Sequence, residues 1–356
     1  MKTADFDYNL PRELIAQEPL WPRDHSRLMV VNKTTQTVEH RHFYDFLDYL
    51  KTGDLLVCNN SKVFRARLYG QLITPEGEVL REHGKPVEIF LVRPMENLGV
   101  WQVLAKPGRH VQNGLRLQFA SDFYCDVMLK EKDGTILVQF SDNDEVVRQK
   151  ANNCGEVPVP PYIKKQPVDL ADYQTIYAKQ EGSVAAPTAG FHFTKELIEK
   201  IRAKGVEIAE ITLHVGLGTF LPVKSEEIEE HRMHSEWVEL NFGTAMAINQ
   251  AKSEGRRVIV VGTTTVRTLE GLAHQAGYAD ERLEPYQGEI NLFITPGFQF
   301  KIIDALITNF HLPKSTLLML VSAFVGNREF MLHCYQQAIK EKYRFYSFGD
   351  GMLITS

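Results

Sequence analysis

Hydrophobic and polar positions follow two different patterns along the chain. From about residue 65 to residue 149, short runs of alternating apolar and polar residues are separated by turn residues. Asp133-Gly134 separates two such runs, and this dipeptide is a strong hairpin signal because both positions of the turn need positive φ. Five runs each suit a strand: residues 87–92, 100–105, 115–119, 123–129 and 135–140. About six short strands with no helix between them predict a small closed antiparallel β-barrel.

In the second half of the chain, the pattern changes to alternating strands and helices. Thr194, Thr244 and Ser315 can each cap the start of a helix, because a side-chain oxygen there accepts a free backbone N–H. A further helix is expected to open at residues 263–265 and to run through Ala276. The expected helices are residues 194–205, 244–255, 263–276, 315–325 and 328–343, with strands at 206–215 and 257–261.

Residues 152–167 connect the two patterns and contain four prolines with no periodicity. We interpret this segment as an extended linker that returns from the barrel to the main body. The sequence therefore predicts an α/β main domain with a mixed, barrel-like sheet, built from residues 1–64 and 152–356. An antiparallel six-stranded β-barrel domain, residues 65–151, is inserted into it, and the length of 356 residues suits two domains.

The composition of the chain indicates in which cellular compartment the protein is expected. The chain carries 40 basic and 45 acidic residues, a net charge of −5, and its 44% apolar content is typical of globular proteins. The four cysteines are scattered without a metal-ligand spacing, which indicates reduced thiols and no zinc or iron–sulfur site. The N-terminus lacks a signal-peptide core, and the longest apolar stretch is about half of a membrane span. We expect a cytoplasmic protein with no membrane segment and no metal.

The sharpest local pattern is VIVVGTTTVRTLE at residues 258–270. A buried strand runs into Gly262 and then into three hydroxyl residues: Thr263, Thr264 and Thr265. A helix that begins here directs free N–H groups at one spot, where a carboxylate or a phosphate can bind. The alternative is structural: Gly262 makes the turn and a threonine caps the helix. From this segment alone, we give the two interpretations equal weight. Arg267 and Glu270, three residues apart, taken alone suggest a surface pair.

Three further segments bring polar residues into apolar surroundings. VAAPTAGFHF, residues 184–193, contains Thr188, Gly190 and His192, and its small residues allow a ligand to approach the backbone. The histidine suits a tuned base or a stacking wall, and a hydrogen-bonded core histidine is the plainer alternative. His214 precedes two glycines at an expected strand end, where α/β folds bind ligands.

Residues 231–236, HRMHSE, end in Glu236, and their spacing matches no zinc-protease pattern. TNFHLPKS, residues 308–315, places Asn309 and His311 beside an apolar helix. Buried polar side chains are costly unless they are hydrogen-bonded, so these two require either a structural partner or a ligand.

Basic residues form local clusters although the net charge is negative. The clusters that concern nucleic acid are Lys62, Arg65 and Arg67, and Lys342 with Arg344. Phosphate affinity arises from local neutralisation, so a patch interleaved with aromatic residues can hold an RNA loop. Composition alone favours solvated surface charge.

Taken together, the segments resemble one family, the S-adenosylmethionine:tRNA ribosyltransferase-isomerases of queuosine biosynthesis. The resemblance includes AAPTAGFHF, HVGLGTFLPV, MHSE and GTTTVRTLE and extends over nearly the whole chain. The matching segments are residues 10–28, 59–70, 158–163, 185–193, 214–223, 233–236, 262–270, 296–315, 320–326 and 341–350. Lys62 departs from the arginine usual in the family, which weakens the case for a bidentate phosphate contact there.

The resemblance implies that the ribosyl part of S-adenosylmethionine is transferred to 7-aminomethyl-7-deazaguanine at the wobble position of tRNA. Isomerisation then yields epoxyqueuosine, while adenine and methionine leave. S-adenosylmethionine is consumed as a substrate, no metal is called for, and we expect a monomer. The runner-up interpretation is a small-molecule α/β enzyme that acts on a nucleotide or a sugar phosphate, and a noncatalytic RNA-binding module comes next.

The same resemblance suggests roles for the singled-out residues. The implied catalytic residues are His192 and His214 as acid and base, with Glu236 and His311. The implied S-adenosylmethionine contacts are Thr188, Gly190, Thr263, Thr264, Thr265, Arg267, Glu270 and Asn309. The helix start with Arg267 would hold the methionine carboxylate, and Glu270 or Glu236 would balance positive charge. Phe191, Phe193 and Phe220 would add cation–π attraction.

The tRNA would present its modified base unstacked in the pocket. The resemblance implies that the basic clusters and the cleft between the two domains supply tRNA binding, with Lys62, Arg65, Arg67, Lys342 and Arg344 as contacts.

Overall fold

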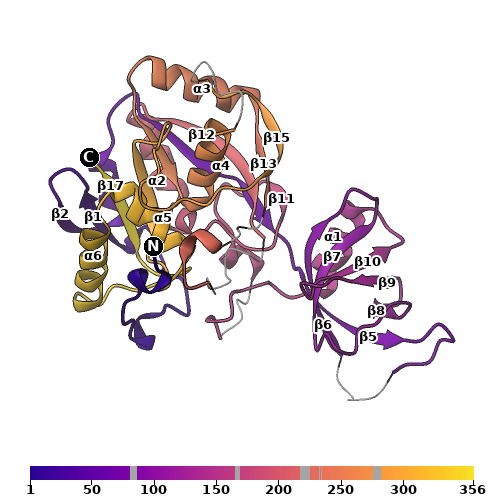
Figure 1. Ribbon diagram of the computed structural model, residues 1–356. Helices are drawn as coiled ribbons and strands as arrows, with labels where there is room; N and C mark the ends of the chain where they lie inside the picture. The colour runs from indigo at the N-terminus through magenta and orange to yellow at the C-terminus, as the bar shows by residue number, and fades with distance from the viewer. Residues whose placement is uncertain (81–85, 165–168, 217–224, 232, 234, 276–281) are drawn as a thin grey trace.

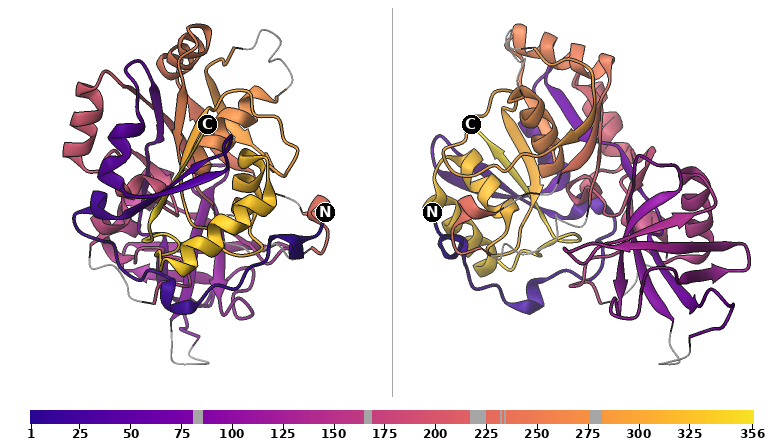
Figure 2. Two further views of the ribbon diagram at one scale, coloured as in Figure 1. Left: turned by 90° about the vertical axis from the view of Figure 1, so that its left-hand side faces the viewer. Right: turned by 45° about the vertical axis from the view of Figure 1, so that its right-hand side comes forward.

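The computed structural model describes residues 1–80, 86–164, 169–216, 225–231, 233, 235–275 and 282–356. The chain forms two bodies that are connected by a few extended segments (Figure 1). Both termini lie in the larger body, and the smaller body consists of one continuous stretch from the first half of the chain (Figure 2). This arrangement is the one expected for an inserted domain, while the predicted domain boundaries themselves stay a prediction.

A nine-stranded mixed sheet forms the centre of the larger body, in the order β15-β13-β12-β3-β14-β16-β17-β1-β2. Strands β12, β3, β14 and β16 are parallel neighbours, whereas β17 runs antiparallel to β16. The mixed sheet is confirmed, but across the described residues it runs from β15 to β2 as an open sheet rather than closing like a barrel. The strands are β1 (Arg27–Asn32), β2 (Thr37–His42), β3 (Leu55–Asn59), β12 (Glu207–His214), β13 (Glu236–Leu240), β14 (Val258–Val261), β15 (Tyr286–Ile290), β16 (Ala305–Asn309) and β17 (Gly351–Thr355).

Helices cover both faces of this sheet, so its central strands are continuous apolar runs. Val258 and Val260 of β14 belong to the core shared with α3, α4, α5 and α6, while Ile259 and Val261 pack on the other face with α2. The alternation follows from the two-residue period of a strand. The helices are α2 (Lys195–Ala203), α3 (Phe242–Ser253), α4 (Thr263–Ala273), α5 (Thr316–Val325) and α6 (Arg328–Lys340).

The predicted starts of α2, α4, α5 and α6 are confirmed, whereas the cap predicted for α3 is wrong. Thr194 caps α2, and Ser315 caps α5, each accepting a backbone N–H. The cap of α3 is Asn241, because the Thr244 hydroxyl lies inside the helix and donates to a backbone carbonyl of β12. Helix α4 has Gly262 at its N-cap position with no side-chain cap, and it ends at Ala273. Its expected end, Ala276, is outside the described residues.

The smaller body is the predicted barrel. Six antiparallel strands close in the order β10-β7-β6-β5-β8-β9, which confirms the expectation. Helix α1 (Asp144–Cys154) follows the last strand and buries Val147 and Ala151 in the barrel core. The extended linker expected from residue 152 therefore begins only after this helix. The strands are β5 (Arg67–Ile73), β6 (Val87–Pro94), β7 (Val100–Lys106), β8 (Arg116–Ala120), β9 (Phe123–Lys130) and β10 (Ile136–Phe140).

The two bodies meet near a short parallel sheet formed by β4 (Ser61–Val63) and β11 (Gln180–Ser183). Strand β4 directly precedes the barrel in the chain, and β11 belongs to the segment that returns from it. The barrel is thus attached to the main body by paired strands rather than by a single free linker.

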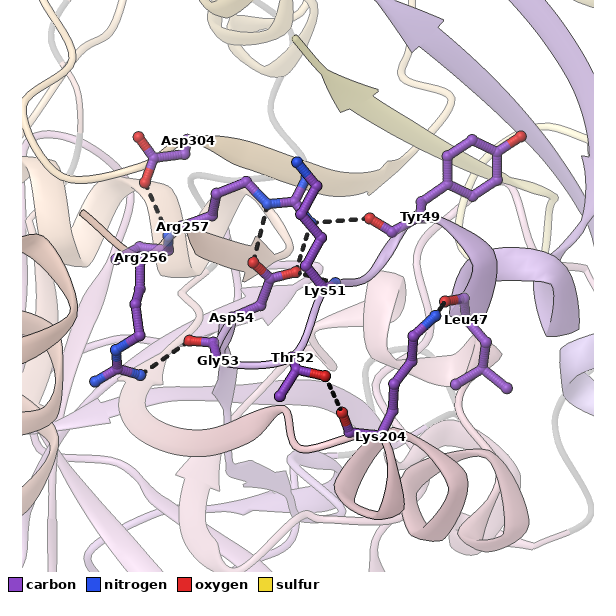
Figure 3. A network of polar contacts seen from close by, with 11 residues as sticks. Leu47, Tyr49, Lys51, Thr52, Gly53, Asp54, Lys204, Arg256, Arg257 and Asp304 are labelled. Atoms are coloured by element: carbon purple, nitrogen blue, oxygen red, sulfur yellow. Dashed lines mark hydrogen bonds and ion pairs between the residues drawn. The ribbon is translucent and has the colours of Figure 1, made fainter. Parts of the chain in front are cut away.

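A polar network joins the elements at the amino ends of the parallel strands (Figure 3). The Asp54 carboxylate accepts from Arg257 Nε at 2.9 Å and from the backbone N–H of Lys51 at 2.7 Å. Arg256 donates to the carbonyl of Gly53 at 3.0 Å. These contacts hold the starts of β3 and β14 together, which leaves the opposite edge of the sheet available for a site.

Candidate active site

The carboxyl ends of β14 and β16 meet at one edge of the sheet, because the two strands are parallel neighbours. A cavity opens there with an empty volume of about 720 Å³, solvent at its mouth included. Five of the predicted site residues line it together: Thr188, Thr263, Thr264, Asn309 and His311.

The start of α4 forms one wall of the cavity. Gly262 connects β14 to the helix with φ of +85°, a conformation that favours glycine. No side chain caps the helix, although Thr263 and Thr264 line the cavity. The first N–H groups of a helix have no partner within the helix and carry partial positive charge. This wall therefore suits a carboxylate or another anionic group. Thr265 lies behind the wall and donates its hydroxyl hydrogen to the carbonyl of Val261.

A chain of hydrogen bonds runs from the cavity into the neighbouring core. The Thr188 hydroxyl donates to Asn309 Oδ1 at 3.1 Å, and Asn309 Nδ2 donates to His192 Nε2 at 3.3 Å. On its other side, His192 Nδ1 lies 2.7 Å from Ser26 Oγ. Because Nε2 accepts, the ring proton of the neutral imidazole resides on Nδ1 and is donated to Ser26. Thus Asn309, from the end of β16, is the direct link between the cavity and His192.

His311 is bonded on both ring nitrogens. Nε2 lies 3.2 Å from Thr308 Oγ1, and Nδ1 lies 3.2 Å from Tyr335 Oη. The Tyr335 hydroxyl also accepts the backbone N–H of His311 at 3.0 Å. These contacts orient the ring on the cavity wall.

Burial depresses the basicity of all three predicted histidines. It lowers the pKa of His192 to about 3, assisted by the positive charges of Arg344 and Arg23. It also lowers the pKa of His214 to about 4 and the pKa of His311 to about 3. Removing an imidazolium from water is unfavourable, so each ring is neutral at pH 7 in the ligand-free protein.

His214 does not line the cavity. It ends β12, stacks on Trp237 with ring centroids 5.0 Å apart, and lies against Gly182. A Cβ on that glycine would come within 2.5 Å of His214 Nε2, so the glycine makes room for the ring. His214 Nδ1 has no hydrogen-bond partner within the described part of the chain.

Arg267, Glu236 and Glu270 also lie away from the cavity lining, although the first and last share α4 with the threonines. Arg267 forms a buried ion pair with Glu236 at the start of β13. Glu270 is fully buried, and its carboxylate accepts the backbone N–H groups of Lys301, Ile302 and Ile303 at 2.9, 3.0 and 3.1 Å. Burial raises its pKa. The structure thus places these charges in contacts that hold the fold together.

Gly190 supports the cavity from behind rather than lining it. A Cβ at this position would come within 2.1 Å of the Tyr177 hydroxyl and 2.7 Å of Thr175 Cγ2. The η6 turn (Thr188–His192) can pack this closely only with glycine at that position.

The predicted aromatic contacts lie in different places. Phe193 is buried against Phe43 and Phe46, away from the cavity. Phe191 lines a second, smaller pocket. Phe220 is outside the described residues, as are Gly218 and His234 of the quoted motifs.

The basic residues are divided between the two bodies. Lys62 lies on β4 with Nζ 3.8 Å from Glu181, and Arg67 begins β5 with Nε 3.4 Å from Glu88. Arg65 lies between them and is half-buried. Lys342 is exposed after α6, while Arg344 is half-buried and lines the second pocket.

Sequence reasoning did not single out several residues that contribute to the two pockets. Tyr162, Tyr346 and Ser347 line the main cavity, and Arg23 and Ser26 line the second pocket. All five lie inside segments that carry the family resemblance, but their residue types have no distinctive spacing. Only their convergence in space identifies them.

Two properties of the described ranges bear on the earlier expectations. No group of three or more histidine, cysteine, aspartate or glutamate side chains there is arranged to hold a metal ion. No helix there is long and apolar enough to cross a membrane.

An open α/β sheet with a cavity at the carboxyl ends of its parallel strands, joined to an inserted barrel, defines a two-domain α/β protein whose candidate ligand site lies at this edge. The sequence matches the queuosine biosynthesis protein family over residues 3–354. The chain therefore belongs to this family, which confirms the resemblance.

Individual relatives match over nearly the full length. The S-adenosylmethionine:tRNA ribosyltransferase-isomerase of Carboxydothermus hydrogenoformans is 52% identical over 354 residues, covering 99% of this chain and 100% of the relative. The protein of the same name from Thermotoga petrophila is 50% identical over 355 residues, with 99% and 100% coverage. The crystal structure of S-adenosylmethionine tRNA ribosyltransferase from Thermotoga maritima has a TM-score of 0.55 and 39% identity, covering 98% of this chain and 99% of that one.

Proposed function

We propose that this protein is an S-adenosylmethionine-dependent tRNA ribosyltransferase-isomerase. It transfers the ribosyl part of S-adenosylmethionine to 7-aminomethyl-7-deazaguanine at the wobble position of tRNA and isomerises it to epoxyqueuosine, with release of adenine and methionine. The observation that carries the proposal is the full-length identity of about half to relatives that bear this enzyme name.

The main cavity is our candidate for the S-adenosylmethionine site. Its polar lining is neutral, with Thr188, Thr263, Thr264 and Asn309 supplying hydroxyl and amide groups for ribose and adenine. The uncapped start of α4 is the candidate for the methionine carboxylate, since a helix N-terminus favours an anion. This lining fits the donor better than Arg267, whose guanidinium is already paired with Glu236.

His192 is our candidate for the residue that removes a proton from the ribose. Its Nε2 lone pair faces Asn309, which lines the cavity, so a rotation of the amide opens Nε2 to a bound substrate. A neutral imidazole can accept a proton. Because the pKa of His192 is low in the ligand-free protein, substrate binding must raise the basicity of this ring. His311 acts at the same cavity as a positioning residue. His214 and Glu236, away from the lining, support the site indirectly.

The tRNA anticodon is proposed to bind across the two bodies. Lys62, Arg65 and Arg67 lie where the barrel joins the main body, and Lys342 with Arg344 lies near the second pocket. We propose further that the protein acts as a cytoplasmic monomer without a metal.

Labelled S-adenosylmethionine incubated with precursor tRNA tests the activity. We expect free adenine and methionine, in amounts that depend on both substrates. Adenine release without RNA would favour a small-molecule enzyme, and S-adenosylhomocysteine as the only product would show methyl transfer instead. Either result would overturn the proposal.

A His192→Asn variant tests the proton-transfer role. We expect turnover to fall by about 10²–10⁴-fold, the usual contribution of general acid–base catalysis, while S-adenosylmethionine binding persists. His214→Asn is the matched comparison outside the cavity. Full activity of His192→Asn would remove this histidine from the mechanism.

A further inference from the structure

A second pocket adjoins the main cavity and has an empty volume of about 230 Å³, open solvent included. Ser347 lines both pockets, and His192, which lines the second, is bonded to Asn309 of the first. The second pocket also contains two guanidinium groups, Arg23 and Arg344.

Arg23 is a buried cation that forms no ion pair with a described carboxylate, although the charge of Asp172 acts on it from farther away. The residue is 6% exposed, and across the described residues no carboxylate lies within ion-pairing distance of it. Its Nη2 donates to the carbonyl of Asp172 at 2.7 Å, but Nη1 has no hydrogen-bond partner in the described part of the chain. The guanidinium carbon also lies 4.8 Å from the ring centre of Trp21 and 4.9 Å from that of Phe191.

Such an arrangement is costly in a protein that binds nothing at this point. Arginine stays charged, and buried charges are ordinarily paired with an opposite charge. Arg344 adds a second guanidinium to the pocket, which forms an ion pair with Asp350 at 3.4 Å and is 31% exposed. The pocket therefore combines two guanidinium groups and an unpartnered Arg23 Nη1 with Ser26 and Ser347 as further hydrogen-bonding groups.

We propose that this second pocket, named here the Arg23 pocket, is an oxyanion subsite in which Arg23 and Arg344 hold one backbone phosphate of the bound tRNA. The assignment rests on the proposed function. A base that enters the main cavity carries its phosphate just outside it, and the shared wall at Ser347 places the Arg23 pocket at that position. The carboxylate of S-adenosylmethionine has the same oxyanion chemistry, but the start of α4 already provides a place for it.

Occupation of the Arg23 pocket would also act on His192. The positive charges of Arg23 and Arg344 contribute to the low pKa of that histidine. A phosphate between the two guanidinium groups neutralises them, and the imidazole becomes a better base. The site would then become competent for proton transfer when tRNA is bound.

Arg23→Met tests the subsite, because it keeps an unbranched, flexible side chain and removes the guanidinium with its charge. The matched control is Arg256→Met, which removes a guanidinium at the opposite edge of the sheet (Figure 3). Binding of precursor tRNA and of S-adenosylmethionine is measured separately for wild type and both variants, over a range of salt concentrations. Binding of tRNA to the wild-type protein is measured first. If the wild type does not bind tRNA, the proposed function fails, and the experiment does not reach the subsite.

We expect Arg23→Met to weaken tRNA binding by about 10- to 100-fold, the effect of losing a hydrogen bond to a charged group. The slope of log affinity against log salt should fall by about one, while S-adenosylmethionine binding and the Arg256→Met control stay at wild-type values. Weakened S-adenosylmethionine binding with unchanged tRNA binding would assign the oxyanion to the carboxylate. Unchanged binding of both would overturn the subsite.

Thermal stability separates this role from a structural one. Because Arg23 lacks an ionic partner, replacing it by a hydrophobic residue of similar volume should leave the unfolding temperature unchanged or higher. A large drop in that temperature, with binding lost only in proportion to the unfolded fraction, would show that Arg23 holds the fold and would overturn the proposal. Arg344→Met provides a second, independent variant with the same expected loss of tRNA affinity.

Discussion

A substitution at Glu270 tests whether this residue of α4 stabilises the fold or binds the ligand. Sequence reasoning assigned it to the positive charge of S-adenosylmethionine, whereas the structure turns its carboxylate toward the backbone of residues 301–303. This stretch leads into β16, the strand that ends in Asn309 at the cavity. The two interpretations predict different effects of Glu270→Gln, which keeps the size of the side chain and removes its charge.

The expected loss of stability follows from the three hydrogen bonds. The oxygen of glutamine can still accept at the Oε1 position, from the N–H groups of Ile302 and Ile303 at 3.0 and 3.1 Å. The Lys301 N–H, 2.9 Å from Oε2, would then face an amide NH₂ group and lose its acceptor. A hydrogen bond to a charged group is worth about 1.5–3 kcal/mol, so we expect the free energy of unfolding to fall by about 2 kcal/mol. Glu270→Ala removes both carboxylate oxygens, so all three N–H groups lose their acceptor, and it should cost at least twice as much.

Urea unfolding followed by circular dichroism measures the loss, and calorimetric titration measures S-adenosylmethionine binding to the folded variant. Glu131→Gln, exposed on the barrel, is the matched control and should leave the unfolding midpoint unchanged. We expect Glu270→Gln to be less stable and to bind S-adenosylmethionine as wild type does. A variant of unchanged stability that no longer binds S-adenosylmethionine would refute the structural assignment.

Acid should destabilise the protein through its buried histidines. The folded-state pKa values of His192, His214 and His311 lie near 3 to 4, below the unfolded value of 6.5, so the unfolded state takes up more protons as the pH falls. Their contribution to stability is therefore complete above pH 6.5 and is lost toward pH 3, and equal urea midpoints at pH 7.5 and pH 5 would contradict it. Gly190→Ala should distort the cavity wall, because its Cβ would come within 2.1 Å of a tyrosine hydroxyl. It should lower both the unfolding temperature and S-adenosylmethionine affinity, whereas Gly216→Ala, with no atom within 4 Å of its Cβ, should do neither.

The local elements were largely predictable because their signals are local. Alternating runs and glycine turns predict five of the six barrel strands within two residues at each end, and Thr194 and Ser315 do cap their helices. The error at α3 has a physical cause, since Asn241 and Thr244 are both good caps only three residues apart. The Thr244 hydroxyl is drawn away by a carbonyl of β12, a partner that is distant in sequence.

The candidate site was only partly predictable. Thr263 and Thr264 lie in the first turn of α4 and line the cavity, but the same helix turns Arg267 and Glu270 to other surroundings. A helix rotates by about 100° per residue, so neighbours in one motif face different parts of the protein. From the sequence alone, the motif is predicted to be one binding unit. In the structure, its threonines line the cavity, whereas Arg267 and Glu270 lie elsewhere.

The sequence by itself determined which segments become strands and helices, the insertion of a barrel, and membership of the queuosine biosynthesis family. Periodicity, caps and turn residues act over a few positions, so they can be read without knowing the fold. Only the tertiary structure decided which charged groups are neutralised. Arg267 pairs with Glu236, 31 residues away on a strand, whereas Arg23 is buried and forms no ion pair within the described part of the chain. Electrostatic pairing depends on distances between segments that folding brings together, and no spacing along the chain specifies those distances.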